Sequence, residues 1–74
     1  MDSIQQRFGV ILRREREAAG LSQEGLAELA GLHRNYVGLL ERGQRIPSLL
    51  VIEKLCGALN TSLSRFFGAV ESLQ

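Results

Sequence analysis

The sequence contains few of the residues on which common metal and disulfide sites depend. Among 74 residues there is one cysteine, one histidine and one proline, and there is no tryptophan. The single cysteine, Cys56, excludes an internal disulfide and a multi-thiolate metal site. The single histidine, His33, excludes a zinc site built from a histidine cluster. We therefore expect no metal and a reducing compartment, the cytoplasm.

Long apolar runs and a strong charge of one sign are also missing. No run approaches the ~18–20 residues of a membrane-spanning helix, so no membrane association is expected. The start of the chain lacks a basic stretch followed by an apolar one, which predicts no signal peptide. Nine basic residues against eight acidic ones give a net charge of +1, which alone indicates no nucleic-acid partner. Eight of the nine basic residues are arginine, however, whose guanidinium fork suits phosphates and base edges.

The length predicts one small domain over residues 1–74, near the lower limit for a chain that folds alone. The fractions of hydrophobic (45%) and charged (23%) residues are typical of a globular protein. One histidine, one cysteine and scattered glutamates cannot supply a nucleophile–base pair, paired carboxylates or a glycine-rich phosphate loop. No enzyme activity, cofactor or small-molecule ligand is expected.

Short helical segments separated by glycine, serine and the one proline make up the whole sequence, and no alternating strand pattern occurs. Serines precede these segments and glycine or asparagine follows them, as is typical of helix caps. The expected helices cover residues 3–19, 22–30, 33–42, 49–59 and a short segment after Ser62, with fraying from about residue 70. The fold class is therefore a compact all-α bundle.

Apolar spacing predicts the buried faces of these helices. In the first helix the apolar positions are Ile4, Phe8, Ile11 and Leu12. In the second they are Leu26, Ala27, Leu29 and Ala30. The stripe of the first helix is interrupted at Glu15, where a carboxylate must reach water or find an arginine.

The segment over residues 22–42 is unusual because its two helices are too short to be stable alone. A short helix pair on a three-helix support is the geometry of a helix-turn-helix. Ala27 is expected where the two helices cross, since a larger side chain would separate them. Gly31 is expected in the turn at a positive φ. Val37 is expected to face inward.

The run LSQEGLAELAGLHRNYVGLLERGQRIPS, residues 21–48, resembles the phage-repressor/Cro type of helix-turn-helix. The similarity covers residues 8–67, and residues 31–45 are especially similar to the small controller proteins of restriction–modification systems. The resemblance implies a five-helix lambda-repressor-like DNA-binding domain, with the helix-turn-helix at about 22–42 and supporting, dimerising helices at about 48–68. It also implies a homodimer that regulates transcription from a roughly palindromic double-stranded DNA operator.

The outward side of the helix over residues 33–42 is the expected DNA-contacting surface. Arginine can fork onto guanine and asparagine can pair bidentately with adenine. The expected base-reading residues are Arg34, Asn35, Gly38, Leu39 and Arg45. Two interpretations of Leu39 stand: contact with a thymine methyl group, or packing against the edge of the fourth helix. The resemblance and position place a second group at the DNA backbone: Gln23, His33, Tyr36 and Arg42. Tyr36 has a second interpretation, half-buried packing with its hydroxyl group at the surface.

Other roles are structural or concern the dimer. The resemblance implies a shielded ion pair between Arg16 and Glu41 that fixes the third helix to the first. Cys56 is expected to pack as a small core residue. Apolar surface left over after the core is filled predicts a C-terminal dimer interface that includes Leu50, Asn60, Leu63, Phe67 and Val70.

A competing hypothesis uses the same fold only as a protein-interaction module, such as an antitoxin-like partner. The combination of Arg34, Asn35 and Arg45 argues against it. Retention on a DNA column that falls steeply with salt would distinguish the two hypotheses.

Overall fold

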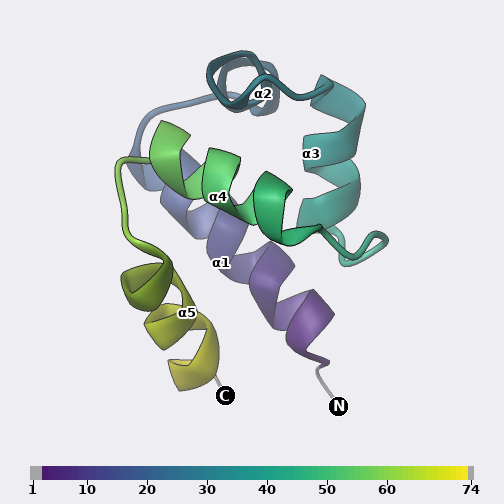
Figure 1. The fold of residues 1–74 in the computed structure, drawn as a ribbon. Helices are drawn as coiled ribbons and strands as arrows, with labels where there is room; N and C mark the ends of the chain where they lie inside the picture. The colour runs from purple at the N-terminus through teal and green to yellow at the C-terminus, as the bar shows by residue number, and fades with distance from the viewer. Residues whose placement is uncertain (1–2, 74) are drawn as a thin grey trace.

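The computed structural model describes residues 3–73, which form five α-helices and no β-strand within that range. The helices are α1 (Ile4–Ala18), α2 (Gln23–Ala30), α3 (Arg34–Glu41), α4 (Leu49–Ala58) and α5 (Leu63–Ser72). In Figure 1, α1 runs diagonally behind α4, while α2 and α3 lie at the top and right. Helix α3 packs against α1 and α2, and α5 packs against α1 and α4. The expected all-α bundle is confirmed.

Side-chain caps begin every helix. The hydroxyl groups of Ser3, Ser22, Ser48 and Ser62 each accept a hydrogen bond from a backbone N–H three residues on, and a capping box is complete at α1. His33 caps α3 instead. Serine caps stabilise a helix by about 1 kcal/mol relative to alanine. The helix starts expected from these residues are therefore confirmed.

Helix α5 is longer than expected. It continues to Ser72, and Val70 within it has no exposed surface. Val70 lies one turn after Phe66 on the same face of the helix, so both enter the core. The expectation of fraying from residue 70 is wrong for residues 70–72; Gln74 lies outside the described residues.

One continuous core joins all five helices. Its buried members are Phe8, Ile11, Leu12, Leu26, Ala27, Ala30, Val37, Leu40, Ile52, Leu55, Cys56, Phe66 and Val70. The rings of Phe8 and Phe66, 5.2 Å apart between centroids, connect α1 to α5. Cys56 packs within this core, as expected.

Two predicted core positions are exposed. Leu29 is 62% exposed because the buried face of α2 consists of Leu26, Ala27 and Ala30, and Leu29 points away from it. Ile4, in the first turn of α1, is exposed as well.

The buried stripe of α1 continues through Arg16 and not through Glu15. Arg16 lies one turn after the buried Leu12, whereas Glu15 remains half-buried at the side of the helix. The prediction that Glu15 lies on the buried stripe was therefore wrong. The stripe continues one position later, at Arg16.

Gly9 sets the distance between α1 and α3. A Cβ atom at Gly9 would lie 2.5 Å from the backbone carbonyl oxygens of both Leu40 and Glu41. Any side chain would therefore push the two helices apart. The close contact holds the end of α3 directly on α1.

Candidate nucleic-acid interface

The hairpin of α2 and α3 is fixed by its turn. Gly31 has φ 70° and ψ 36°, the left-handed conformation expected of it. After it, the backbone N–H of Leu32 donates to the carbonyl of Ala27 at 2.8 Å, and the Nδ1 of His33 accepts from the N–H of Asn35. Ala27, whose carbonyl accepts the bond from Leu32, is itself buried in the core.

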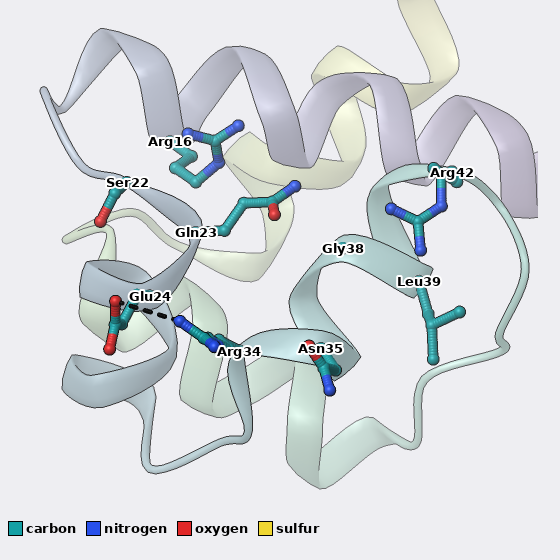
Figure 2. A pocket seen from close by; sticks show the side chains of 9 residues that line it. All are labelled: Arg16, Ser22, Gln23, Glu24, Arg34, Asn35, Gly38, Leu39 and Arg42. Atoms are coloured by element: carbon teal, nitrogen blue, oxygen red, sulfur yellow. Dashed lines mark ion pairs between the residues drawn. The ribbon is translucent and has the colours of Figure 1, made fainter.

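An open groove lies between α2 and α3, and Figure 2 shows the side chains gathered around it. It is lined by Arg16, Ser22, Gln23, Glu24, Arg34, Asn35, Gly38, Leu39 and Arg42. We call this surface the α2–α3 groove. It brings together four of the predicted DNA contacts on α3 with Gln23 at the start of α2. Leu39 is half-exposed and lines the groove, which favours its outward interpretation.

Gly38 lies in the groove but is not exposed, contrary to expectation. A Cβ atom there would come 3.1 Å from Nη1 of Arg42 and 3.4 Å from Oε1 of Gln23. These two side chains therefore lie over the glycine. The absence of a side chain at Gly38 therefore makes room for Gln23 and Arg42 rather than leaving bare backbone.

A buried ion pair supports the floor of the groove. Nε of Arg16 donates to Oε2 of Glu41 at 2.6 Å, and Nη2 donates to Oε1 at 3.1 Å. The remaining Nη1 donates to the backbone carbonyl of Leu21 at 2.9 Å. The ion pair expected between Arg16 and Glu41 is thus present. Its hydrogen bond to Glu41 raises the pKa of Arg16 against the opposing effect of burial.

Glu41 also fixes Gln23. The amide Nε2 of Gln23 donates to Oε1 of Glu41 at 3.0 Å. One amide hydrogen is thereby used inside the protein, and a second remains for an outside acceptor. The network therefore connects α1, α2 and α3 and orients a side chain of the groove.

The two exposed arginines of the groove, Arg34 and Arg42, also have partners. Nη1 of Arg34 lies 3.6 Å from Oε1 of Glu24, drawn as a dashed line in Figure 2. Nε of Arg42 donates to Oε1 of Gln44 at 3.0 Å. Both pairs are exposed, so each arginine is oriented and still accessible.

Comparison with known proteins decides the family. A model of the helix-turn-helix family matches residues 12–66 of the chain. The chain belongs to the helix-turn-helix family. Control protein C.MunI from Mycoplasma sp is 39% identical over 72 residues, covering 96% of this chain and 97% of its own. Control protein C.SmaI from Serratia marcescens is 46% identical over 54 residues, and the match covers 73% of this chain and 64% of C.SmaI.

A solved structure supports the same assignment. The restriction–modification controller protein C.AhdI from Aeromonas hydrophila has 52% identity and a TM-score of 0.83, over 85% of this chain and 96% of C.AhdI. This helix-turn-helix chain is thus a DNA-binding transcriptional regulator of the controller-protein type. The similar proteins are regulators and not enzymes.

Some predicted contacts of the helix-turn-helix lie outside the groove. Arg45 is exposed in the loop between α3 and α4. Tyr36 is half-buried against the core, the alternative expected for it. His33 lines a neighbouring hollow together with Arg34 and Glu28.

A second, apolar hollow lies between α4 and α5. It is lined by Leu49, Leu50, Ile52, Glu53, Leu63 and Phe67, and we call it the α4–α5 apolar face. Leu49 at its edge is 83% exposed. A further apolar hollow beside it shares Ile52 and Phe67 and extends to Ile46 and Pro47. Exposed apolar surface of this kind is typical of interaction sites.

The predicted dimer residues divide into two groups. Leu50, Leu63 and Phe67 line the α4–α5 apolar face, and Asn60 is exposed in the turn beside it. Val70 does not belong with them, because it is fully buried in the core of its own chain. The prediction that Val70 belongs to the dimer interface was therefore wrong.

Glu24 and Gln44, the partners of the two exposed groove arginines, were not predicted from the sequence. Acidic residues are common in the first turn of a helix because they interact favourably with its dipole. Nothing in the sequence therefore indicated that Glu24 contacts Arg34.

Within residues 3–73 no cluster of three potential metal ligands occurs, and no helix there is long and apolar enough to cross a membrane.

Proposed function

We propose that the protein is a homodimeric repressor or activator that binds a roughly palindromic operator in double-stranded DNA. Each α3 would enter the major groove of one half-site, and the half-sites would lie ~34 Å apart. The observation that carries the proposal is the α2–α3 groove, where two accessible arginines, an asparagine and a half-exposed leucine converge at the surface of α3.

The residues divide by what they can recognise. Arg34 and Asn35 are in the first turn of α3, the part of a recognition helix that reaches base edges. Leu39 offers an apolar contact to a thymine methyl group. Gly38 contributes by giving space to its neighbours. Arg45, exposed in the following loop, adds a base contact beyond the helix.

The DNA backbone would be held from both sides of α3. Gln23, at the N-terminus of α2, keeps one amide hydrogen free for a phosphate, and the helix dipole favours an anion there. Arg42, His33 and Tyr36 lie on the flanks of the recognition helix. Such contacts fix the position of the protein without reading sequence.

Dimerisation would occur through the α4–α5 apolar face. Leu50, Leu63 and Phe67 present apolar surface that a second copy would cover, with Asn60 at the edge. Two-fold symmetry would pair this face with itself, and we propose that it directs the two α3 helices to the same side of the dimer. Protein concentration would then control operator occupancy in the cytoplasm.

The similarity to C.MunI, C.SmaI and C.AhdI extends the proposal to the target genes. We propose that the operator controls the genes of a restriction–modification system. Sequencing of duplexes selected by the protein from a random pool tests both the palindromic operator and the proposed target genes. The expected result is a palindromic motif that occurs upstream of restriction or methyltransferase genes in the source genome.

Two other outcomes would contradict parts of the proposal. A selected motif without two-fold symmetry would contradict the dimeric mode of binding. Failure to select any motif, with retention on DNA that does not fall with salt, would favour the protein-interaction alternative.

A further inference from the structure

Glu24 is a carboxylate on a surface proposed to meet DNA. It is in the first turn of α2 and lines the α2–α3 groove beside Gln23 and Arg34. Its Oε1 is 3.6 Å from Nη1 of Arg34, and the two side chains are 74% and 64% exposed. A carboxylate in this position repels phosphates, so its presence calls for a compensating function.

We propose that Glu24 determines specificity by holding Arg34 for a guanine and withholding it from phosphates. This inference rests on the proposed base-reading role of Arg34. Glu24 would act through Arg34 as a positioning residue, without its own contact to a base.

The chemistry of the guanidinium group permits both contacts at once. It carries five N–H donors, and Glu24 engages the Nη1 side. The edge formed by Nε and Nη2 remains free to fork onto the O6 and N7 acceptors of guanine. Because a guanine edge carries no net charge, it can approach Arg34 while the carboxylate stays in place.

A phosphate group, unlike a guanine edge, carries a negative charge. It competes with Glu24 for the same cation and is repelled by the carboxylate. Phosphate contacts supply most of the affinity for non-cognate DNA, so the pair lowers binding to sequences that lack the guanine. The position of Glu24 is itself favourable, since the N-terminus of α2 stabilises a negative charge.

The pair contributes little to folding. Exposed ion pairs and charges at a helix N-terminus have small effects on stability, so replacing Glu24 by the isosteric glutamine should lower the melting temperature by only about a few degrees. An effect of Glu24→Gln on DNA binding can therefore be separated from an effect on the fold.

The test compares Glu24→Gln with Glu28→Gln. Glu28 is exposed one turn further along α2, forms no ion pair within residues 3–73, and its replacement changes the net charge equally. Affinities are measured for the selected operator and a scrambled duplex over a series of salt concentrations. For Glu24→Gln we expect roughly threefold to fivefold tighter binding to scrambled DNA and a salt slope steeper by about 1. Preference at the base pair read by Arg34 should also relax.

The same comparison in the Arg34→Ala background tests whether Glu24 acts through Arg34. There the difference between Glu24→Gln and Glu28→Gln should disappear, because the partner of Glu24 is missing. Equal effects of the two glutamine variants in the wild-type background, or a difference that persists without Arg34, would overturn the inference. If wild-type protein selects no motif at all, the proposed function fails and the inference fails with it, a result distinct from either of those.

Discussion

Arg16 of α1 and Glu41 of α3 form a two-pronged ion pair, in which two N–H groups of one guanidinium donate to the two oxygens of one carboxylate. Their side chains are only 11% and 3% exposed. The carboxylate receives its third hydrogen bond from Gln23 of α2. One buried contact thus holds α3 on its support and orients Gln23, a predicted phosphate contact.

Arg16→Met should destabilise the protein strongly. The variant keeps an apolar stem but leaves Glu41 buried without its cation, at a cost of about 3 kcal/mol. Arg13→Met is the matched control, because the Arg13–Glu17 pair is exposed on the same helix and should contribute ~0–1 kcal/mol. Denaturant unfolding measures the free energy of unfolding of both variants. Equal free energies of unfolding for the two variants would reject a structural role for the buried pair.

Gly9→Ala should also destabilise the fold, for a steric reason. The added methyl group would collide with the carbonyl oxygens of Leu40 and Glu41, and relieving the collision costs about 1–3 kcal/mol. Gly57→Ala in α4 is the control, since a Cβ there meets nothing within 4 Å. That change should stabilise by roughly 0.5–1 kcal/mol. Thermal melts that move in the same direction for both variants would contradict the close contact of α1 with α3.

Helix boundaries could be predicted from the sequence because caps are local. Each serine cap acts within three residues of itself, and Gly31 ends α2 by its own backbone conformation. The resemblance supplied the pairing of Arg16 with Glu41, which lie 25 positions apart. No local pattern connects two such distant residues.

The failures of prediction concern contacts between helices. Spacing shows which residues share one face of a helix, but it does not show which neighbour covers that face. Leu29 was therefore placed inside, Val70 outside and Gly38 on open surface, each contrary to the structure. The contact of Glu24 with Arg34 was missed for the same reason, since it depends on how α2 and α3 are placed together.

Leu63→Glu should convert a dimer to a monomer. Leu63 lines the α4–α5 apolar face, where a charge would be buried at the proposed interface. Leu29→Glu introduces the same charge at a position that is 62% exposed on α2 and lies outside this face. Sedimentation should show monomer for the first variant and dimer for the second. Monomeric wild-type protein at high micromolar concentration would contradict the dimer proposal.

Cys56 should make stability depend on pH in the alkaline range. Burial raises the pKa of the Cys56 thiol, and the charge of Glu15 raises it further. A raised pKa in the folded state favours the neutral thiol, so this stabilisation is complete below the unfolded-state pKa of ~8.5 and is lost as pH rises through the folded-state value. Cys56→Ala should therefore lose less stability between pH ~8 and ~10 than wild type does. Parallel stability curves for the two proteins would contradict the burial effect.

We claim that α3 reads DNA sequence through Arg34. Selection from a random duplex pool by wild type, Arg34→Ala and Gln23→Ala would decide this. Arg34→Ala should cost ~1–3 kcal/mol per half-site and erase the preference at one base pair. Gln23→Ala should weaken all sequences about equally and leave the motif intact, because a phosphate is the same at every position. A motif unchanged by Arg34→Ala would contradict the claim and transfer base reading to Asn35, Leu39 or Arg45.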